Sequence, residues 1–423
     1  MLASRLTQSL NSDFETWEDS EKKTVEDSVH MKKKFSLLIA LMSVAGLIAL
    51  APLAANAQDD AQADFERAWY DTCYAKKDVE KCYQQSKELV DKYSTKSTYI
   101  ESAKKQIKLY EQNKASEKFQ AAFDAYYKQP PQDAAKLEGL FAAGDAFIQI
   151  EPDKQSPSHL FVLGQMALAG HQAAIGRVYD KLDKIKGYIE QAMSEFESAQ
   201  ASEKTKKDFD LYVVPLKDLV AANGAQFLGF RTIETKGDAG QALEYLAKAT
   251  HVKGKDGAGW KDPYNYFLRT IVYNNQYIEA RKPYDAMTDE QKTSDAGKEI
   301  LKKVNELLDT KLIPEYARVL ATATSPNTKP LYDAAKPQFD VLWKFRTDAP
   351  DKAAEYIKNY VNDPTITNVP VPAKPEDASS LNAPAPVTNP GAVKVQPGGP
   401  AAPGSNGAKP TADKKSAVKG RRP

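Results

Sequence analysis

The 423-residue sequence has few of the residues that metal sites and redox centres need, with only two cysteines and four histidines. These few side chains are scattered, and no Cys-x-x-Cys pair is present. The sequence also lacks a His-Glu-x-x-His segment, a Gly-x-Ser-x-Gly segment and a phosphate-binding Walker loop. We therefore predict a protein that is not an enzyme and that holds no metal or cofactor.

A strong charge of either sign is lacking too, because 58 Lys and Arg side chains balance 57 Asp and Glu side chains. Nucleic-acid binding relies on a basic surface, so this balance argues against a nucleic-acid partner. Strand-like segments are equally scarce: the only β-like run in the body, 211–214, is cut short by Pro215. The glycine-rich run Lys253–Gly259 follows no strand and is predicted to be a loop.

The chain does contain an apolar run near its beginning. Lysines 32–34 precede the apolar segment Phe35–Met42, and Ala55-Asn56-Ala57 has the small-x-small form of a cleavage site. This pattern predicts a secretory signal peptide over 31–57, cleaved near Ala57, and a body exported to the periplasm or cell envelope. Residues 1–30 are polar and form an upstream extension if translation starts at Met31. If Met1 is the start, the apolar run would remain as a membrane anchor.

The hydrophobic spacing of the body is helical. Ala242, Leu246 and Ala249 share one face of a helix that follows the turn Gly237-Asp238, and an apolar helix over 219–235 precedes this turn. Two helices joined by so short a turn pack antiparallel. Further helices are predicted over 97–127, 134–150, 158–170, 176–202, 296–308, 315–323, 331–345 and 352–361. The predicted fold class is all-α.

The segment 237–250 resembles a tetratricopeptide (TPR) repeat, in which small, bulky and small residues recur on the second helix. A further copy resembles the family at Tyr264, Phe267, Leu268 and Ile271 on a first helix and at Ala280, Tyr284 and Met287 on a second. Pro283 and the spacing of 280 − 242 = 38 residues depart from the family pattern. The resemblance implies a TPR-like α-solenoid, an array of antiparallel helix pairs, over 58–364. An irregular helical bundle is the alternative.

Arrays of this family bind partners in a groove that the first helix of each pair lines. The resemblance places Arg231, Asn265, Arg269 and Tyr273 in that groove. The arginines would pair with a peptide carboxylate, and Asn265 would hydrogen-bond the peptide backbone. The resemblance and the export signal together imply a non-enzymatic binding or scaffolding protein of a bacterial cell envelope, whose partner is another envelope protein or peptide.

Cys73 and Cys82 are nine residues apart. On one continuous helix they would lie on opposite faces, about 13 Å apart along the axis. A turn at 76–78 would instead place them on two antiparallel helices, where an oxidising compartment favours a disulfide. Two buried free thiols are the alternative.

The composition changes at the C-terminal end. Pro, Ala, Gly and Asn dominate 365–423, and such a segment is predicted to be disordered because it cannot bury a core. It carries eight basic and three acidic side chains, a net charge of +5, whereas 58–364 carries 44 and 47, a net −3. A second hypothesis follows: a structural envelope protein tethered by this tail to anionic wall polymer or lipid. A solubilising linker without a partner fits the same composition.

Overall fold

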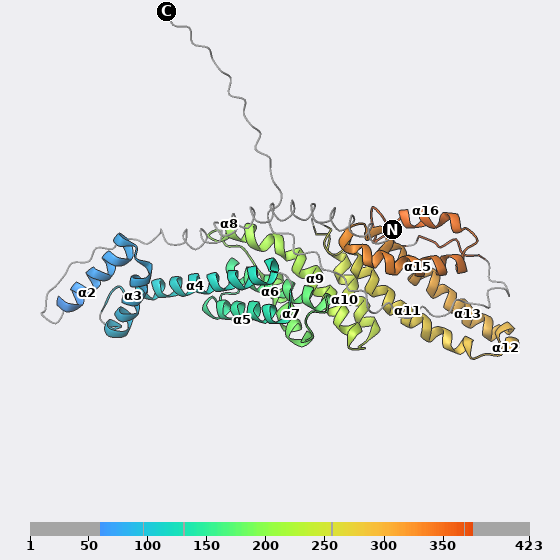
Figure 1. Cartoon of the computed structure of the whole chain (residues 1–423), viewed down its shortest axis with the longest axis horizontal. Helices are drawn as coiled ribbons and strands as arrows, with labels where there is room; N and C mark the ends of the chain where they lie inside the picture. The colour runs from blue at the N-terminus through green and yellow to red at the C-terminus, as the bar shows by residue number, and fades with distance from the viewer. Residues whose placement is uncertain (1–59, 96, 130–131, 255–256, 368, 375–423) are drawn as a thin grey trace, which may run out of the picture. The chain divides into compact units, whose positions relative to one another are not determined.

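The computed structural model describes residues 60–374, apart from 96, 130, 131, 255, 256 and 368 (Figure 1). The predicted upstream extension, the signal peptide and the tail from 375 onward lie outside these residues. Within the described part the chain is helical and holds no strand, with one isolated β-bridge between Lys253 and Gly259. The predicted all-α class is confirmed.

The helices follow one another through short connections (Figure 1). The first half contains α2 (Asp60–Tyr70), η1 (Asp71–Lys76), α3 (Val79–Tyr93), α4 (Ile100–Lys128), α5 (Ala134–Ile150), α6 (Pro157–Ile175), α7 (Leu182–Ser198) and α8 (Lys206–Asp208). The second half contains η2 (Phe209–Val213), α9 (Val214–Glu234), α10 (Ala239–His251), α11 (Pro263–Asp285), α12 (Asp289–Thr293), α13 (Asp295–Leu307), η3 (Leu308–Leu312), α14 (Ile313–Thr322), η4 (Pro326–Thr328), α15 (Lys329–Arg346), η5 (Pro350–Lys352) and α16 (Ala353–Lys358).

Helices that are neighbours in sequence pack against each other along most of the chain. Such pairs include α3 with α4, α4 with α5, α6 with α7, α9 with α10, and α14 with α15. Contacts between helices farther apart in sequence, α6 with α9 and α11 with α14, join these pairs. This is the pairing expected when short loops connect helices that each bury one apolar face.

The hairpin of α9 and α10 confirms the prediction for 219–250. Ala242, Leu246 and Ala249 are buried, and a Cβ atom on Gly229 of α9 would lie 2.8 Å from the Leu246 Cγ atom. The Asp238 side chain caps α10 by accepting a hydrogen bond from a backbone N–H of the first turn at 2.7 Å. Small residues therefore bring the two helices close, and Leu246 fills the space between them.

The sequence predicted two helices joined by a turn within 264–287, and this prediction is wrong. Tyr264 and Tyr284 lie on one continuous helix, α11, instead of on two helices. Pro283 falls in the last turn of this helix, where its missing N–H costs a single hydrogen bond and does not end the helix. The helices predicted over 296–308 and 315–323 are likewise joined, because the π-helical turn η3 links α13 directly to α14. The resemblance to the TPR family stays a prediction.

Helix α6 forms the buried centre of the first half. All of its residues except Ser158 are buried, because α5, α7 and α9 cover it. A helix that is apolar on all sides is stable only when it is enclosed in this way. Its glycines allow close contact: a Cβ atom on Gly164 would lie 2.9 Å from the Phe196 ring, and one on Gly170 would lie 3.0 Å from Ile185.

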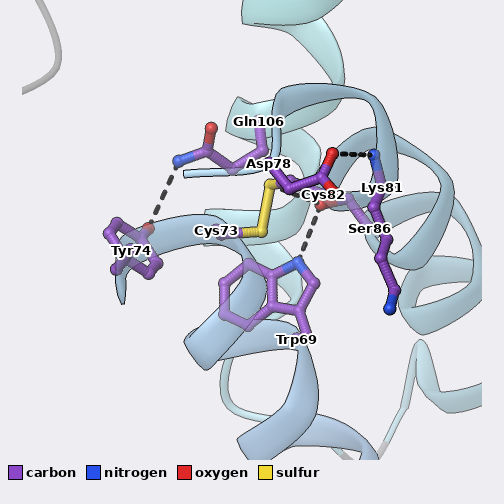
Figure 2. The surroundings of a disulfide bond; sticks show 8 residues. All are labelled: Trp69, Cys73, Tyr74, Asp78, Lys81, Cys82, Ser86 and Gln106. Carbon is purple, nitrogen blue, oxygen red and sulfur yellow. Dashed lines mark hydrogen bonds between the residues drawn. A yellow bond between two sulfur atoms is a disulfide. The ribbon is translucent and has the colours of Figure 1, made fainter. Parts of the chain in front are cut away.

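At the N-terminal end, Cys73 of η1 and Cys82 of α3 form a disulfide, as predicted (Figure 2). The chain reverses at Lys77, whose φ of 54° lies in the left-handed region, and this brings the two Cα atoms to 4.9 Å. Beneath the disulfide, the Trp69 indole N–H donates to the Ser86 hydroxyl at 2.8 Å (Figure 2). Trp69 packs with residues of α3 and α4 in a small core of Leu89, Ile100 and Ala103.

Replacing Cys73 and Cys82 together with serine is expected to lower the free energy of unfolding by about 2 kcal/mol, because the disulfide closes only a short loop. Denaturant titration with and without a reducing agent measures this change. The reductant should bring the unaltered protein to the stability of the double variant and leave the variant itself unchanged. Equal stability of the two proteins without reductant would contradict the stabilising role.

The predicted start of the disordered segment at residue 365 is wrong. Residues 365–374, apart from 368, belong to the described structure and lie against α14, α15 and α16. The guanidinium of Arg318 donates to the carbonyl oxygens of Pro364 and Ile366, at 2.8 Å each, and the Tyr356 hydroxyl donates to the Val369 carbonyl. The amino-acid composition of this segment gave no sign that it packs on the helices, because it makes these contacts through backbone carbonyls and not through its side chains.

Candidate functional site

The four residues predicted to line a groove lie on α9 and α11, and all are engaged within the chain. Arg231 donates from Nη2 to Asp183 at 2.5 Å, and Arg269 pairs with Glu315 at 2.8 Å. Asn265 is fully buried, and Tyr273 is only 8% exposed. Their role in binding a partner stays a prediction, and the structure assigns each of them an internal contact or a buried position.

Asn265 belongs to a buried chain of hydrogen bonds, which we call the polar relay. It runs from His171 of α6 through Gln226 of α9 to Asn265 and ends at the carbonyl of Gly259. The His171 Nε2 atom lies 2.8 Å from the Gln226 Oε1 atom, and the Gln226 amide donates to Asn265 at 3.0 Å. The Asn265 amide then donates to the Gly259 carbonyl at 2.9 Å. The relay therefore fixes a loop against three helices.

Asp262 completes the relay at the start of α11. Its carboxylate accepts from the Gln226 amide at 2.7 Å and, as the helix N-cap, from the Tyr264 backbone N–H at 2.9 Å. Shielding from water raises the pKa of the Asp262 carboxyl. Since the Gln226 amide donates to two acceptors, its Oε1 atom must accept, and the His171 Nε2 atom must carry the proton.

This assignment leaves His171 with an unprotonated Nδ1 atom that is buried and has no hydrogen-bond partner in the described structure. A second proton would place a positive charge in an apolar interior. Burial accordingly lowers the pKa of His171 from 6.5 to about 4, although the bond to Gln226 opposes the shift. The imidazole is closed to solvent at 6% exposure, so it acts as a donor within the fold.

The depressed pKa of His171 predicts a loss of stability in acid. The His171 imidazole binds a proton more tightly in the unfolded chain than in the folded one. Its contribution to the free energy of unfolding is therefore full above pH 6.5 and falls as the pH drops toward 4. The expected loss is up to about 3 kcal/mol. Denaturant titrations across this range, on the protein and on His171→Leu, measure the effect. The variant should show a shallower pH dependence, and an equal slope in both proteins would contradict the assignment.

The loop held by the relay spans 252–262, between α10 and α11. Its backbone is closed by the bond from the Trp260 N–H to the Val252 carbonyl at 3.1 Å, and the Tyr266 hydroxyl donates to the Trp260 carbonyl at 2.5 Å. Gly259 sits at the tightest point with a φ of 80°. These bonds hold the described loop residues around Val252, Gly259 and Trp260 in place. Trp260 is half-buried, and Lys253 and Lys261 on either side of it in sequence are exposed.

A charge cluster around the buried Glu315 joins α11 to α14. Glu315 of α14 is 2% exposed, and its Oε1 atom accepts from Arg269 at 2.8 Å and from Arg318 at 2.9 Å. The Arg318 guanidinium also lies 4.8 Å from the centroid of the Tyr360 ring. One carboxylate therefore accepts from two guanidinium groups, the partly exposed one of Arg269 and the buried one of Arg318. Arg318 also holds the segment 364–366 in place.

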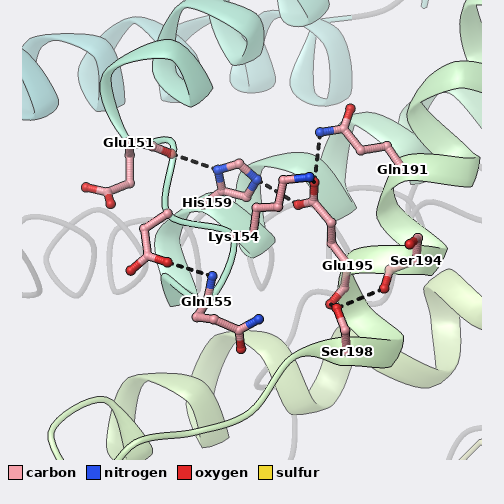
Figure 3. A network of polar contacts seen from close by, with 9 residues as sticks. Glu151, Lys154, Gln155, His159, Gln191, Ser194, Glu195 and Ser198 are labelled. Carbon is pink, nitrogen blue, oxygen red and sulfur yellow. Dashed lines mark hydrogen bonds and ion pairs between the residues drawn. The ribbon is translucent and has the colours of Figure 1, made fainter.

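A second buried pair, His159 and Glu195, ties the start of α6 to α7 (Figure 3). The His159 Nδ1 atom lies 2.7 Å from the Glu151 carbonyl oxygen, and its Nε2 atom lies 2.8 Å from the Glu195 carboxylate. Lys154 pairs with the other oxygen of Glu195 at 3.2 Å. Both ring nitrogens are occupied, so the pair connects two helices and offers no free base to a substrate.

Neither His159 nor His171 is a surface residue. Both are buried, at 1% and 6% exposure, and both connect helices. Among the described residues, no group of His, Cys, Asp and Glu side chains has the arrangement of a metal site. No helix in this part of the chain is long and apolar enough to span a membrane.

Sequence reasoning missed the loop residues Lys253, Trp260 and Lys261. It identified a glycine-rich loop between two helices but gave it no role. An aromatic residue close to several lysines was the available signal, although it says nothing about whether the loop is rigid. That information comes from Gln226 and Asn265, which lie outside the loop in sequence.

Comparison with known proteins identified no relative of this chain. No protein-family model, no curated protein and no solved structure matches the chain.

Proposed function

We propose that this chain is a non-enzymatic binding or scaffolding protein of a bacterial cell envelope, exported by the signal peptide predicted over 31–57. The observation that carries the proposal is the loop between α10 and α11, whose described residues 252–254 and 257–262 are held by hydrogen bonds and expose Lys253 and Lys261 beside Trp260. Loops that a rigid scaffold positions commonly carry binding residues. A preformed loop also loses little conformational freedom when it meets a partner.

The buried polar groups support the same proposal. The relay from His171, the pair of His159 with Glu195, and the cluster around Glu315 each join separate helices. Such ties hold a helical array in one geometry, which a scaffold requires. Titratable groups in these ties are enclosed, whereas a catalytic base must reach its substrate.

Affinity capture from an envelope extract tests the proposal, with the purified exported chain as bait and mass spectrometry of the bound proteins. A variant that ends at residue 374 is the matched control, because it keeps the segment that Arg318 holds. The proposal expects one specific protein at physiological salt with both baits. Recovery of wall polymer or lipid alone, lost in the shortened variant or at higher salt, would instead support the tail-tether hypothesis.

A further inference from the structure

The surface formed by Lys253, Trp260 and Lys261, here called the loop surface, combines two cations with one aromatic ring. The Lys261 Nζ atom lies 4.5 Å from the centroid of the Trp260 ring, and the Lys253 Nζ atom lies 5.4 Å from it. An ammonium group is attracted to the face of an indole at these distances. The ring therefore brings two exposed lysine side chains to one place.

What distinguishes this surface is that two lysines share one ring, since a single lysine without a carboxylate partner among the described residues also lies over a ring, Lys87 over Tyr83. Other lysines over rings do have carboxylate partners. Lys248 lies over the Tyr245 ring and also pairs with Glu244 at 2.8 Å. Lys181 lies over the Tyr179 ring and pairs with Glu138 at 2.9 Å.

In contrast, neither Lys253 nor Lys261 forms an ion pair with a carboxylate of the described residues. The loop surface thus holds two charges that the described fold does not neutralise at contact distance.

The positive charges of Lys253 and Lys261 also act on Asp363, in the neighbouring segment 363–366. Hydrogen bonds from the Thr365 hydroxyl and backbone N–H lower the pKa of the Asp363 carboxyl, and the charges of Lys253 and Lys261 lower it further. Asp363 is already engaged by Thr365, at 2.5 Å from its hydroxyl. The two ammonium groups therefore create a field that favours a carboxylate.

We propose that the loop surface is a docking site for an acidic segment of a partner protein, in which carboxylates flank an apolar side chain. The inference rests on the proposed function and specifies the chemistry of its partner. Each lysine would pair with one carboxylate, and the indole of Trp260 would cover the apolar side chain between them. Tryptophan is enriched among the residues that dominate protein interfaces, and complementary charge sets register and association rate.

The geometry favours an acidic peptide over an acidic sugar. A sugar ring stacks on an open aromatic face, whereas ammonium groups lie over the Trp260 ring. A peptide carboxylate can pair with the Lys253 and Lys261 ammonium groups without reaching the face of the ring. An aliphatic side chain, unlike a sugar ring, needs only part of the indole, and the half-buried Trp260 keeps part of its surface exposed.

Fluorescence anisotropy with a short labelled peptide, in which glutamates flank a leucine, tests the inference on the purified chain. A peptide with glutamine at every glutamate position is the ligand control. The test variant is Lys253→Gln with Lys261→Gln. The matched control is Lys248→Gln with Lys181→Gln, which removes the same charge from lysines that also lie over rings.

We expect the acidic peptide to bind in preference to the glutamine peptide, and the test variant to weaken binding about tenfold. The control variant should stay within about twofold, since its lysines already have carboxylate partners. No preference for the acidic peptide, or equal weakening in both variants, would overturn the inference. Binding of polygalacturonate instead of the peptide would overturn it as well.

Affinity capture separates this inference from the proposed function. If the Lys253 and Lys261 double variant still captures the same specific protein as the unaltered chain, the loop surface is not the site but the binding function stands. If neither protein captures a specific partner, the proposed function fails independently of the peptide measurement.

Discussion

Replacing Gly259 with alanine is expected to lower the free energy of unfolding by about 3 kcal/mol and to displace the loop 252–262. Gly259 has a φ of 80°, in the left-handed region that a Cβ atom disfavours. A Cβ atom there would also clash with the backbone carbonyl oxygens of Ala249 and Val252, the latter at 2.7 Å. These oxygens belong to the end of α10 and the base of the loop, so a side-chain rotation cannot relieve the clash.

Gly139→Ala is the matched control for this substitution. Gly139 lies within α5, and a Cβ atom there would meet nothing within 4 Å. Alanine at a helical position is better than glycine by up to about 1 kcal/mol, so this variant should be as stable as the unaltered protein or more so. Denaturant titration compares the two. Hydrogen exchange over 252–262 should rise in Gly259→Ala only, and unchanged stability and exchange would contradict the account of a tightly closed loop.

Replacing Glu315 with alanine is expected to cost about 4 kcal/mol of the free energy of unfolding. The substitution leaves the buried Arg318 guanidinium and the partly exposed Arg269 guanidinium without their shared carboxylate. Removing one member of a buried ion cluster costs far more than the net strength of the pair, because the remaining charge stays desolvated. The loss should appear in denaturant titration as a lower midpoint.

Glu299→Ala tests whether the loss of charge alone accounts for such a change. Glu299 pairs with Lys303 at 3.5 Å on the surface of α13, where its side chain is 58% exposed. An exposed pair contributes little, so this variant should change stability by less than about 1 kcal/mol. Similar losses in the two variants would contradict the buried character of the cluster around Glu315.

Local patterns predicted the parts of the fold that depend on near neighbours. Ala242, Leu246 and Ala249 identified the buried face of α10, and the Gly237-Asp238 turn marked its start, because helix faces and caps are set within a few residues. The cysteine hairpin was predictable for the same reason. The repeat pattern predicted two helices between Tyr264 and Met287, whereas α11 is one continuous helix from Pro263 to Asp285.

The candidate site was beyond sequence reasoning because it is built from distant segments. His171, Gln226 and Asn265 are ordinary polar residues until the packing of α6, α9 and α11 aligns them. The groove assignment failed to anticipate that Arg269 has a buried partner, since Glu315 lies 46 residues along the chain. Hydrophobic periodicity reports which face of a helix is buried, and it does not report which polar groups meet there.

Hydrogen exchange on the complex with the captured partner tests the central claim most directly, because it locates the binding surface on the chain. The account predicts that backbone amides of 252–262 exchange more slowly in the complex than in the free protein, and that the Lys253 and Lys261 double variant loses this protection. Protection confined to residues beyond 374, with no change over 252–262, would contradict the account and assign partner binding to the tail.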